Sequence, residues 1–463
     1  MAMSKEGPQT TGNIPKMPRA MQNTSNNTSL HSKLCLLQCI SKYTGPKDID
    51  SKRHEPSLEP IELRRAFTNQ VSYLCDGRKD GTTVTGCFVQ ASGNENVLWV
   101  ASNEGVEQNV RTFLEWMILE VLRVVTNESR NYYEEKLLVR AVALAADRLR
   151  FYQRKMCDFA KGCINSLTHC RKRVADARML ITKIRQLQNI SWHDKLSTAC
   201  YKARGDGKLQ SLLSTIPAQL GISDNCFTEL AHYIGRLGAH AFAVKTVIGA
   251  ALSLPSIKGI TQVQYEACPP GPEGLTMDIG HTGPYELVRN ILEARPDMHL
   301  RQKLQLLEAF VSVDMQKNLT AQYRSQMDLP ESFKTVVHAE LQLCDLASRK
   351  NMRFLDDDPY VGCSKPSCYF CQRYLMSHHR GFIIPPSHNK VLTGVRAPAA
   401  DPKRDIKGRG AALLRTAQMN MEWKVEEDIL DELRTGSSTI QFQHCSTDGF
   451  DLATSVITTQ MGQ

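Results

Sequence analysis

One histidine and two cysteines constrain this chain more than any other feature of its sequence. They lie in His338-Ala339-Glu340 and in Pro366-Ser367-Cys368-Tyr369-Phe370-Cys371. An imidazole and two thiolates supply three ligands, which leave a tetrahedral zinc ion one open position for water. Pro366 suits a helix start, and cysteines three residues apart lie on one face of that helix. The pattern predicts a Zn²⁺ site that joins this helix to a second one carrying His338.

The carboxylate two residues after His338 gives this predicted site a chemistry. Zinc lowers the pKa of a bound water towards about 7, so hydroxide is available at neutral pH. Glu340 is close enough to reach the same pocket without being a ligand, and we expect it to move protons between water, substrate and departing amine. A His/Cys/Cys zinc with such a glutamate is the apparatus of hydrolytic nucleobase deaminases.

Two other interpretations of the cysteines stay open. A closed structural zinc site would need a fourth ligand, and it would leave Glu340 without a role. Alternatively, no metal binds and the cysteines are small buried apolar residues. The candidates for a fourth ligand are Cys363, His378, His379, His388, His444 and Cys445.

Length, charge and cysteine usage set broader limits. A chain of 463 residues can hold more than one folded unit, and a net charge of +9 permits an anionic ligand without requiring one. The fifteen cysteines form no regular framework and no secretory signal is recognisable, so we expect free thiols in the cytoplasm or nucleus. The most apolar stretch, residues 239–252, is too short to span a bilayer and contains His240 and Lys245.

Periodicity divides the chain into five segments. Residues 1–60 are polar and predicted to be mostly disordered, and residues 61–105 read as a helix followed by strands at 84–90 and 97–101. A helical period dominates 106–330, with a Pro/Gly-rich loop at 268–274. Strand and helix alternate again over 331–435, and residues 436–463 form a polar tail.

The metal-site motifs resemble those of the zinc-dependent nucleotide and nucleic-acid deaminase superfamily. The likeness is greatest to a deaminase-like branch abundant in fungi, through Val337–Glu340, Ser364–Cys371 and Ser387-His388-Asn389-Lys390. Many relatives place Pro directly before the first cysteine, whereas Ser367 intervenes here. Substrates of the cytidine and tRNA deaminases therefore do not transfer to this chain.

The resemblance implies an α/β fold, with a three-layer cytidine-deaminase-like core in which helices cover both faces of a mixed sheet. The family order is helix, strand, strand, then the His-X-Glu helix. Here that last helix follows residue 330, so we expect a large all-helical insertion over 106–330 in a single core. The rival arrangement, an unrelated N-terminal domain before a complete deaminase, needs two strands between Cys268 and Lys334, where one weak candidate is visible.

The resemblance also suggests substrate contacts. Family members often place an asparagine after the second strand to bind the substrate's sugar or backbone, and Asn103 has that position, although Asn-Glu-Gly is also good turn chemistry. Ala339, Ser367 and His388 are further candidate contacts, although an ordinary loop residue is the favoured interpretation of His388. Tyr369 and Phe370 would line a base pocket or pack against the sheet.

Two remaining groups of residues point to nothing specific. The basic stretch from Arg148 to Arg185 could contact phosphates, but the solvated face of helices is the favoured interpretation. His232 and His240 have no carboxylate partner nearby in sequence and are expected to be ordinary core or surface histidines.

The expected function is hydrolytic deamination of a nucleobase-containing substrate, free or within nucleic acid, with release of ammonia. The alternative is a catalytically silent deaminase-like fold that serves as a binding or regulatory module. The helical region could offer a surface to a protein partner. Neither the base nor the oligomeric state can be inferred from the sequence.

Overall fold

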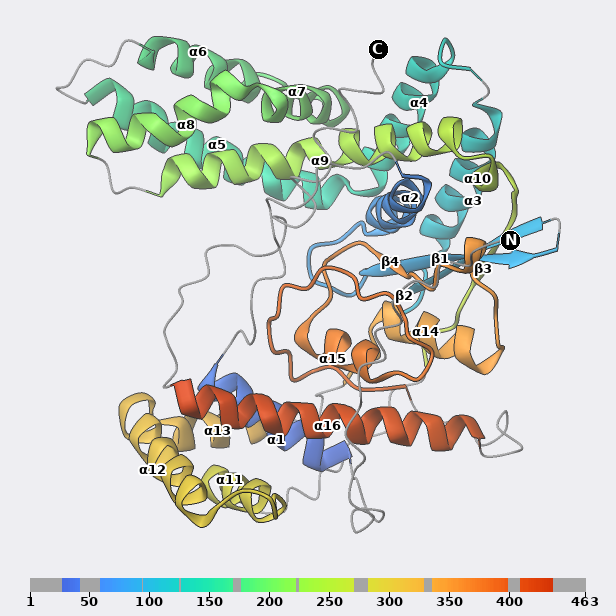
Figure 1. Cartoon of the computed structure of the whole chain (residues 1–463). Coiled ribbons are helices and arrows are strands. Elements are labelled where there is room, and N and C mark those ends of the chain that lie inside the picture. Colours follow the sequence, from blue (N-terminus) through green and yellow to red (C-terminus); the bar gives the residue numbers. More distant parts are fainter. Residues whose placement is uncertain are drawn as a thin grey trace, which may run out of the picture.

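The computed structural model describes residues 27–41, 59–93, 95–124, 126–169, 176–221, 225–269, 282–328, 335–398 and 409–435. Within these ranges the protein is a mostly helical α/β structure with a four-stranded mixed sheet of order β3-β2-β1-β4 (Figure 1). None of the described helices combines the length and apolarity needed to cross a membrane.

The sheet is built on a hairpin. Strands β1 (Thr85–Ser92) and β2 (Glu95–Ser102) pair antiparallel over their full length, and Gly93 takes a positive φ of 63° in the turn between them. β4 (Gly362–Cys363) pairs antiparallel with β1, and β3 (Ile260–Tyr265) runs parallel to β2 on the other side. The sheet thus joins segments of the chain on both sides of the long helical region.

Helices lie on both faces of this sheet (Figure 1). Successive strand residues point to opposite faces, and Cys87 and Val89 of β1 belong to one apolar cluster while Phe88 between them belongs to the other. Helix α2 (Pro60–Cys75) contributes to the first cluster, and helix α14 (Ala339–Arg349) contributes to the second. Burial of both faces explains why β1 reads as a nearly continuous apolar run.

Gly362 allows α2 to lie directly on β4. A Cβ atom at this position would lie 2.5 Å from Thr68 Oγ1 and 2.6 Å from the Thr68 carbonyl carbon. The Ser72 hydroxyl donates to the Gly362 carbonyl oxygen at 3.2 Å. This close approach holds the segment that continues from β4 towards Cys368.

The region 106–330 is mostly helical, as expected, but it is not all helical. Helix α9 (Cys226–Ser253), the longest of the described helices, is buried along most of its length. Helices α5 (Ala146–His169), α7 (His193–Gly205) and α2 pack against it. β3 follows α10 and returns to the sheet, which corrects the expectation of an all-helical segment. The other helices of the region are α3 (Gln108–Arg123), α4 (Arg130–Leu144), α6 (Ala177–Gln188), α8 (Gly207–Leu220), α10 (Pro255–Lys258), α11 (Pro284–Glu293), α12 (Leu300–Lys317) and α13 (Leu319–Met327).

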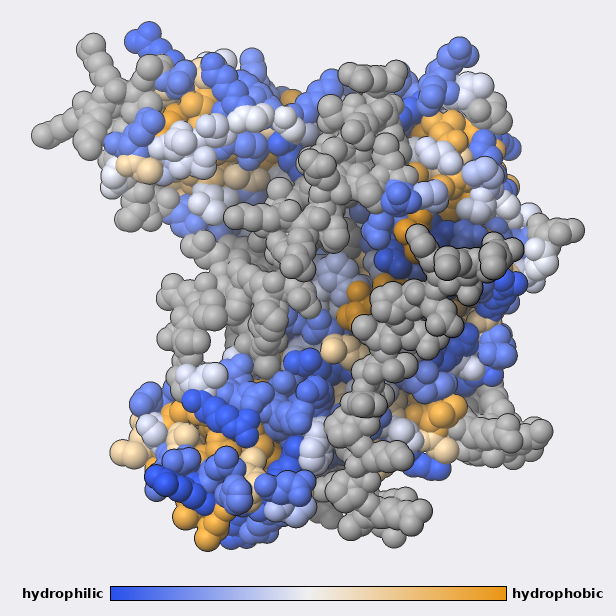
Figure 2. All heavy atoms as spheres, in the orientation of Figure 1, coloured by the Kyte–Doolittle hydropathy of each residue, from blue (hydrophilic) through white to orange (hydrophobic). Residues whose placement is uncertain are grey.

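Helix α12 carries a row of exposed apolar side chains. Four of them recur at helical spacing and are 45–84% exposed, and the corresponding part of Figure 2, at the lower left, is rich in hydrophobic residues. A protein-partner surface on the helical region stays a prediction. The four residues are Leu300, Leu304, Val311 and Met315.

The first sixty residues contain a well-packed helix, contrary to the expectation of disorder there. Helix α1 (Asn27–Ile40) lies against α13 and against α16 (Arg409–Thr435) near the other end of the chain (Figure 1). Lys33 on α1 forms ion pairs of 2.6 Å with both Glu422 and Glu426 of α16. The remaining predicted disorder, at 1–26 and 42–58, and the predicted tail at 436–463 lie outside the described residues.

Two expected elements near the cysteines differ in the structure. The cysteine helix α15 (Tyr369–Ser377) begins at Tyr369 and not at Pro366. Within the segment expected to alternate strand and helix, residues 381–384 are irregular, and the chain around them makes isolated bridges between Ser367 and Ser387 and between Val336 and Val395. A short 3-10 turn, η2 (Leu355–Asp357), precedes β4.

The contacts and burial of Arg148 and Arg150, from the basic stretch, and of His240 bear on the interpretations of these residues. Arg150 is exposed and pairs with Asp147 one helical turn away, whereas Arg148 is buried and pairs with Asp76. His240 is fully buried, and burial holds its pKa well below the ordinary value. These observations agree with the solvated-face interpretation for Arg150 and the core interpretation for His240.

Candidate metal centre

His338 sits at the N-cap of α14, with φ −63° and ψ 151°. The chain before it is held by a bridge in which the Val336 N–H donates to the Gly394 carbonyl oxygen at 2.9 Å. The chain after it is held by Asn103, whose Oδ1 accepts from the Ala339 N–H at 2.9 Å. Backbone contacts on both sides therefore position the imidazole.

The two cysteines open α15. Cys368 is its N-cap, and its sulfur accepts from the Cys371 N–H at 3.5 Å. Ser367 is anchored just before, because its N–H donates to the Pro386 carbonyl oxygen and its own carbonyl oxygen accepts from the Ser387 hydroxyl, both at 2.9 Å. The helix N-terminus carries positive partial charge, which favours thiolates at these positions.

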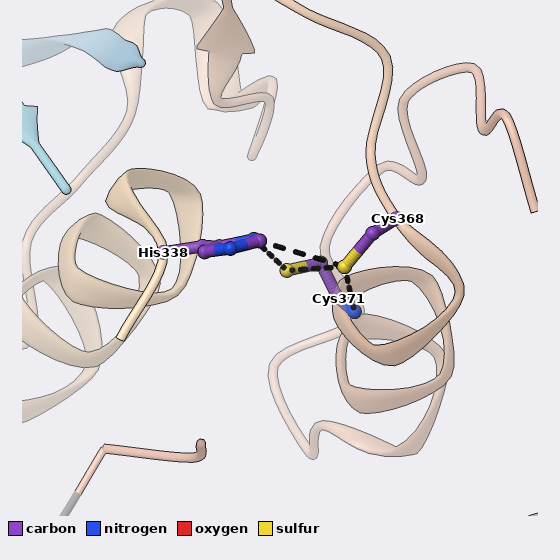
Figure 3. Close-up of side chains that lie close together, drawn as sticks. All are labelled: His338, Cys368 and Cys371. Carbon is purple, nitrogen blue, oxygen red and sulfur yellow. Dashed lines mark hydrogen bonds between the residues drawn. The ribbon is translucent and has the colours of Figure 1, made fainter. Parts of the chain in front are cut away.

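The three side chains converge from two helices (Figure 3). His338 Nδ1 lies 3.3 Å from Cys371 Sγ and 3.7 Å from Cys368 Sγ, and the two sulfurs are 3.5 Å apart. Tetrahedral zinc with ordinary bond lengths would place its sulfur ligands about 3.8 Å apart and each sulfur about 3.6 Å from the nitrogen. The observed triangle and the N/S donor set fit a metal of this kind.

Without a metal the cluster holds opposite charges in close contact. Burial acts to lower the pKa of His338, but the neighbouring Cys368 thiolate raises that pKa to about 9. Burial acts to raise the pKa of Cys368, whereas hydrogen bonding from Cys371 and the charge of His338 bring it well below the ordinary value. The pKa of Cys371 is raised well above its ordinary value by burial and by Cys368. Metal binding would therefore release protons from this cluster.

Glu340 lies beside the cluster without being one of its close donors. It is 3% exposed, and the Cys363 thiol donates to its Oε2 at 3.8 Å. Among the described residues, the donor atoms that approach one another closely enough to share an ion are those of His338, Cys368 and Cys371. Cys363, His378, His379 and His388 do not join them, and His444 and Cys445 lie outside the described residues. The closed four-ligand alternative therefore gains no support from the described part of the chain.

A cavity of about 480 Å³ opens beside the cluster. His338, Glu340 and Cys368 form one side of it, and the loop 80–84 and residues 392–395 form other parts of its wall. Its size suits a small organic ligand. The arrangement therefore combines a possible metal site, an acid that is not a ligand and room for a substrate.

Two of the predicted substrate contacts line this cavity. Asn103 does so, yet its Oδ1 accepts from Ala339 and its Nδ2 donates to the Gly81 carbonyl oxygen at 2.9 Å, so both polar atoms are already engaged. His388 also lines the cavity, and its Nδ1 accepts from the Lys390 N–H at 3.0 Å. Burial lowers the pKa of His388, which favours the neutral ring at pH 7.

The other predicted contacts are placed as packing residues. Ala339 is fully buried, and Ser367, 1% exposed, is engaged by the 386–388 segment. Tyr369 donates its hydroxyl to Asp428 Oδ2 at 2.6 Å, and Phe370 is buried in the apolar core. None of these four is among the residues that line the described cavity.

Sequence reasoning missed several contributors to the cavity wall, among them Gln38 and Lys365. Gln38 reaches it from α1, and its Nε2 donates to the Val391 carbonyl oxygen at 2.7 Å. Lys365 lines it from the cysteine side and lies 3.6 Å from the buried carboxylate of Asp76. The Lys-Pro-Ser-Cys motif contains Lys365, but no local signal connects residue 38 with residue 391.

Comparison with known proteins agrees with this geometry. Residues 337–399 match a family model described as OTT_1508-like deaminase. The matched segment contains the three clustered donors, Glu340 and His388. No curated protein and no solved structure matches the chain. The findings support a deaminase-like domain with a possible metal site.

Proposed function

We propose, from the deaminase-like segment 337–399, that this chain is a zinc-dependent hydrolase that removes an exocyclic amine from a nucleobase-containing substrate. The observation that carries the proposal is the convergence of one imidazole and two sulfurs within 3.7 Å, beside a buried glutamate that is not one of the donors. The match to a deaminase family model supports the same reaction class.

In this proposal His338, Cys368 and Cys371 hold the metal. When bound, zinc supplies an activated water at its open position. Glu340 takes a proton from water and delivers it to a ring nitrogen of the substrate, and it then helps to protonate the amine that leaves as ammonia. Burial of Glu340 keeps these transfers out of bulk solvent. Asn103 and the Val336–Val395 bridge hold the turn that places Glu340 next to His338.

We further propose that the two parts of the chain around 106–330 form one deaminase core. Antiparallel pairing of Gly86 with Cys363 supports this arrangement, because a residue before the helical region shares the sheet with one after it. α2 and α14 on opposite faces of that sheet would be the outer layers of a three-layer fold. The rival arrangement, with an independent N-terminal domain, does not account for this pairing.

Ammonia release tests the proposed reaction. Zinc-loaded full-length protein would be incubated with a panel of bases, nucleosides, nucleotides and single-stranded nucleic acids. Glu340→Gln should lower the rate by about 10²-fold or more while zinc content and thermal stability stay unchanged. Glu293→Gln, on the exposed surface of α11, is the matched control and should retain the wild-type rate.

Three results would count against the proposal. Activity that survives Glu340→Gln would remove the proton role of this residue. Loss of zinc or of the fold in that variant would make Glu340 a structural residue. Absence of ammonia from every substrate would favour the catalytically silent binding module.

A further inference from the structure

The charges on the cavity wall are unequal, and this bears on the substrate class if the proposed function holds. Among the described residues that line the cavity, three carboxylates face a single ammonium group. The carboxylates belong to Asp80, Glu104 and Glu340, and the ammonium group belongs to Lys365. The two thiolates of Cys368 and Cys371 would offset the charge of a divalent metal. The described part of the cavity wall therefore carries a net negative charge, which a bound metal with its two thiolate ligands would not cancel.

Lys365 already faces acidic groups. Its ammonium group lies 3.6 Å from Asp76 Oδ2, and Asp76 is fully buried. The Thr83 hydroxyl donates to Asp76 Oδ1 at 2.8 Å, which fixes that carboxylate in place. Lys365 also lies close enough to Asp80 to lower the pKa of that acid. An incoming phosphate would have to compete with two resident carboxylates for this ammonium group.

Asp80 and Glu104 are the two acids of the cavity wall outside the metal-site motifs. Asp80 Oδ1 accepts from the Thr82 N–H at 3.0 Å and from the Thr82 hydroxyl at 2.6 Å. These hydrogen bonds from Thr82 hold the pKa of Asp80 below its ordinary value. The Glu104 carboxylate is exposed. Both acids can accept hydrogen bonds from a ligand.

Gln38 adds a neutral acceptor to the same wall. Its Nε2 donates to the Val391 carbonyl oxygen at 2.7 Å, and its amide oxygen can accept a hydrogen bond from a ligand. Helix α1 is itself anchored by the Lys33 ion pairs to α16, so Gln38 has a fixed support. The cavity thus presents acceptors from three separate parts of the chain.

We infer that the cavity takes an uncharged, donor-bearing ligand of the nucleoside class, and that it disfavours nucleotides and nucleic-acid strands. The sugar hydroxyls of a nucleoside can donate to Asp80, Glu104 and Gln38. A phosphate group in the same place would be repelled by the two carboxylates, and this repulsion is stronger in a partly enclosed cavity than in water.

Binding of unreactive nucleosides tests this inference without any need for turnover. Uridine and inosine carry no exocyclic amine to release, so they would be titrated calorimetrically against zinc-loaded wild-type protein, beside their 5′-monophosphates. We expect at least one nucleoside to bind about fivefold or more tightly than its monophosphate at low ionic strength. The preference should shrink in 0.5 M salt, a condition of about 4 Å screening length.

A charge-neutralising variant identifies the origin of the preference. Asp80→Asn with Glu104→Gln removes both charges and keeps one acceptor oxygen at each position, and it should improve monophosphate binding to within about twofold of the nucleoside. Asp147→Asn with Glu293→Gln removes the same charge from exposed helix surfaces and should leave the preference intact.

Several outcomes would overturn the inference. They are tighter binding of the monophosphates, no binding of any of the four probes, an unchanged preference in the cavity variant, or an equal change in the surface variant. The proposed function fails independently, because it is judged by ammonia release. Selective nucleoside binding without ammonia release would retain the inference and reject the enzyme, and ammonia release with tighter monophosphate binding would do the reverse.

Discussion

The side-chain amide of Asn103 joins the end of β2 to the first residue of the His-X-Glu helix. Its Oδ1 accepts from the Ala339 N–H and its Nδ2 donates to the Gly81 carbonyl oxygen, each at 2.9 Å. Ala339 lies between His338 and Glu340, so this bond acts on the turn that carries both. Asn103 is thus placed as a positioning residue, even though it also lines the cavity.

Asn103→Ala should weaken metal binding more than substrate binding. The change leaves the buried Ala339 N–H unpaired, while the Gly81 carbonyl oxygen keeps its bond from the Val84 N–H, and we expect a loss of about 1–2 kcal/mol in the free energy of unfolding. Zinc affinity should fall about tenfold or more, as for other residues that orient metal ligands. Competition with a chromogenic chelator measures the affinity. Asn103→Asp keeps an acceptor oxygen for the Ala339 N–H, so its losses of stability and of zinc affinity should be smaller than those of Asn103→Ala.

A direct substrate contact would give the opposite pattern for Asn103→Ala. KM would rise while zinc affinity and kcat stayed near the wild-type values. Asn96→Ala is the matched control, because Asn96 also donates its side-chain amide to a backbone carbonyl oxygen, that of Ser256, at the far end of β2. It should affect stability without changing zinc affinity.

The metal site predicts one zinc ion per chain, measured by elemental analysis after dialysis. Cys368→Ser and Cys371→Ser should each abolish stoichiometric binding, because a hydroxyl replaces a thiolate ligand. Chelation should lower the thermal midpoint of the wild type, since a ligand bound at 100 times its Kd stabilises a protein by about 2.7 kcal/mol. The two variants should show no such shift.

Cys363→Ser separates an open site from a closed one. Cys363 contacts Glu340 and lies outside the three-donor cluster, so this variant should keep one zinc per chain. Loss of zinc equal to that of Cys368→Ser would identify a fourth protein ligand and argue against the hydrolytic role. Cys157→Ser, at a half-buried cysteine of α5, controls for general effects of the substitution.

Local spacing was enough to predict the clustered donors, because each lies at a helix start that the sequence marks. His338 and Cys368 are N-caps, and Cys371 is in the first turn that follows. The sequence pattern predicts that Pro366 opens the cysteine helix, whereas the helix begins at Tyr369, directly after its N-cap Cys368. The predicted start is therefore wrong by only about one helical turn, because Pro366 lies just before the N-cap.

Other features depend on contacts that no local pattern contains. Helix α1 begins in a polar Asn-Thr-Ser run, and its ion-pair partners Glu422 and Glu426 lie more than 380 positions further along the chain. β3 is a short strand with three exposed residues, so its sequence shows only a weak alternation of apolar and polar side chains. Its pairing with β2 cannot be inferred from the local sequence. The position of Asn103 after the second strand is visible in the sequence, but its bond to the Ala339 N–H depends on the fold.

Lys33→Met tests whether α1 is an integral part of the fold. The substitution keeps much of the side-chain volume but leaves Glu422 and Glu426 without their shared cation, in a place where all three side chains are at most 12% exposed. We expect a loss of about 2–3 kcal/mol in the free energy of unfolding, below the upper range for buried pairs because Arg295 still pairs with Glu426. Urea denaturation measures it.

A surface ion pair within α16 provides the comparison for Lys33. Lys424 is 47% exposed and pairs with Glu427 on α16, so Lys424→Met should change stability by less than about 0.5 kcal/mol. Equal effects of the two substitutions would mean that α1 contributes little to the stability of this part of the protein.

His378 should make the protein less stable as the pH falls below 6.5. Burial, with the nearby charges of His379 and Arg380, lowers the pKa of His378 to about 4. Between about pH 4 and pH 6.5 the unfolded chain therefore binds a proton that the folded chain does not, and stability rises with pH across this window. His378→Asn can still accept the Arg380 N–H in place of Nδ1 but cannot titrate.

The difference in unfolding free energy between wild type and His378→Asn isolates this proton. Zinc release at acidic pH affects both proteins and cancels in the comparison. From pH 7 to pH 5 the advantage of the wild type should shrink by about 1–2 kcal/mol. His299→Asn, at an exposed histidine before α12, should track the wild type at both pH values. A constant difference between wild type and His378→Asn would mean that the folded protein takes up this proton as readily as the unfolded chain does, which the packing of the ring against Tyr374 and Phe382 argues against.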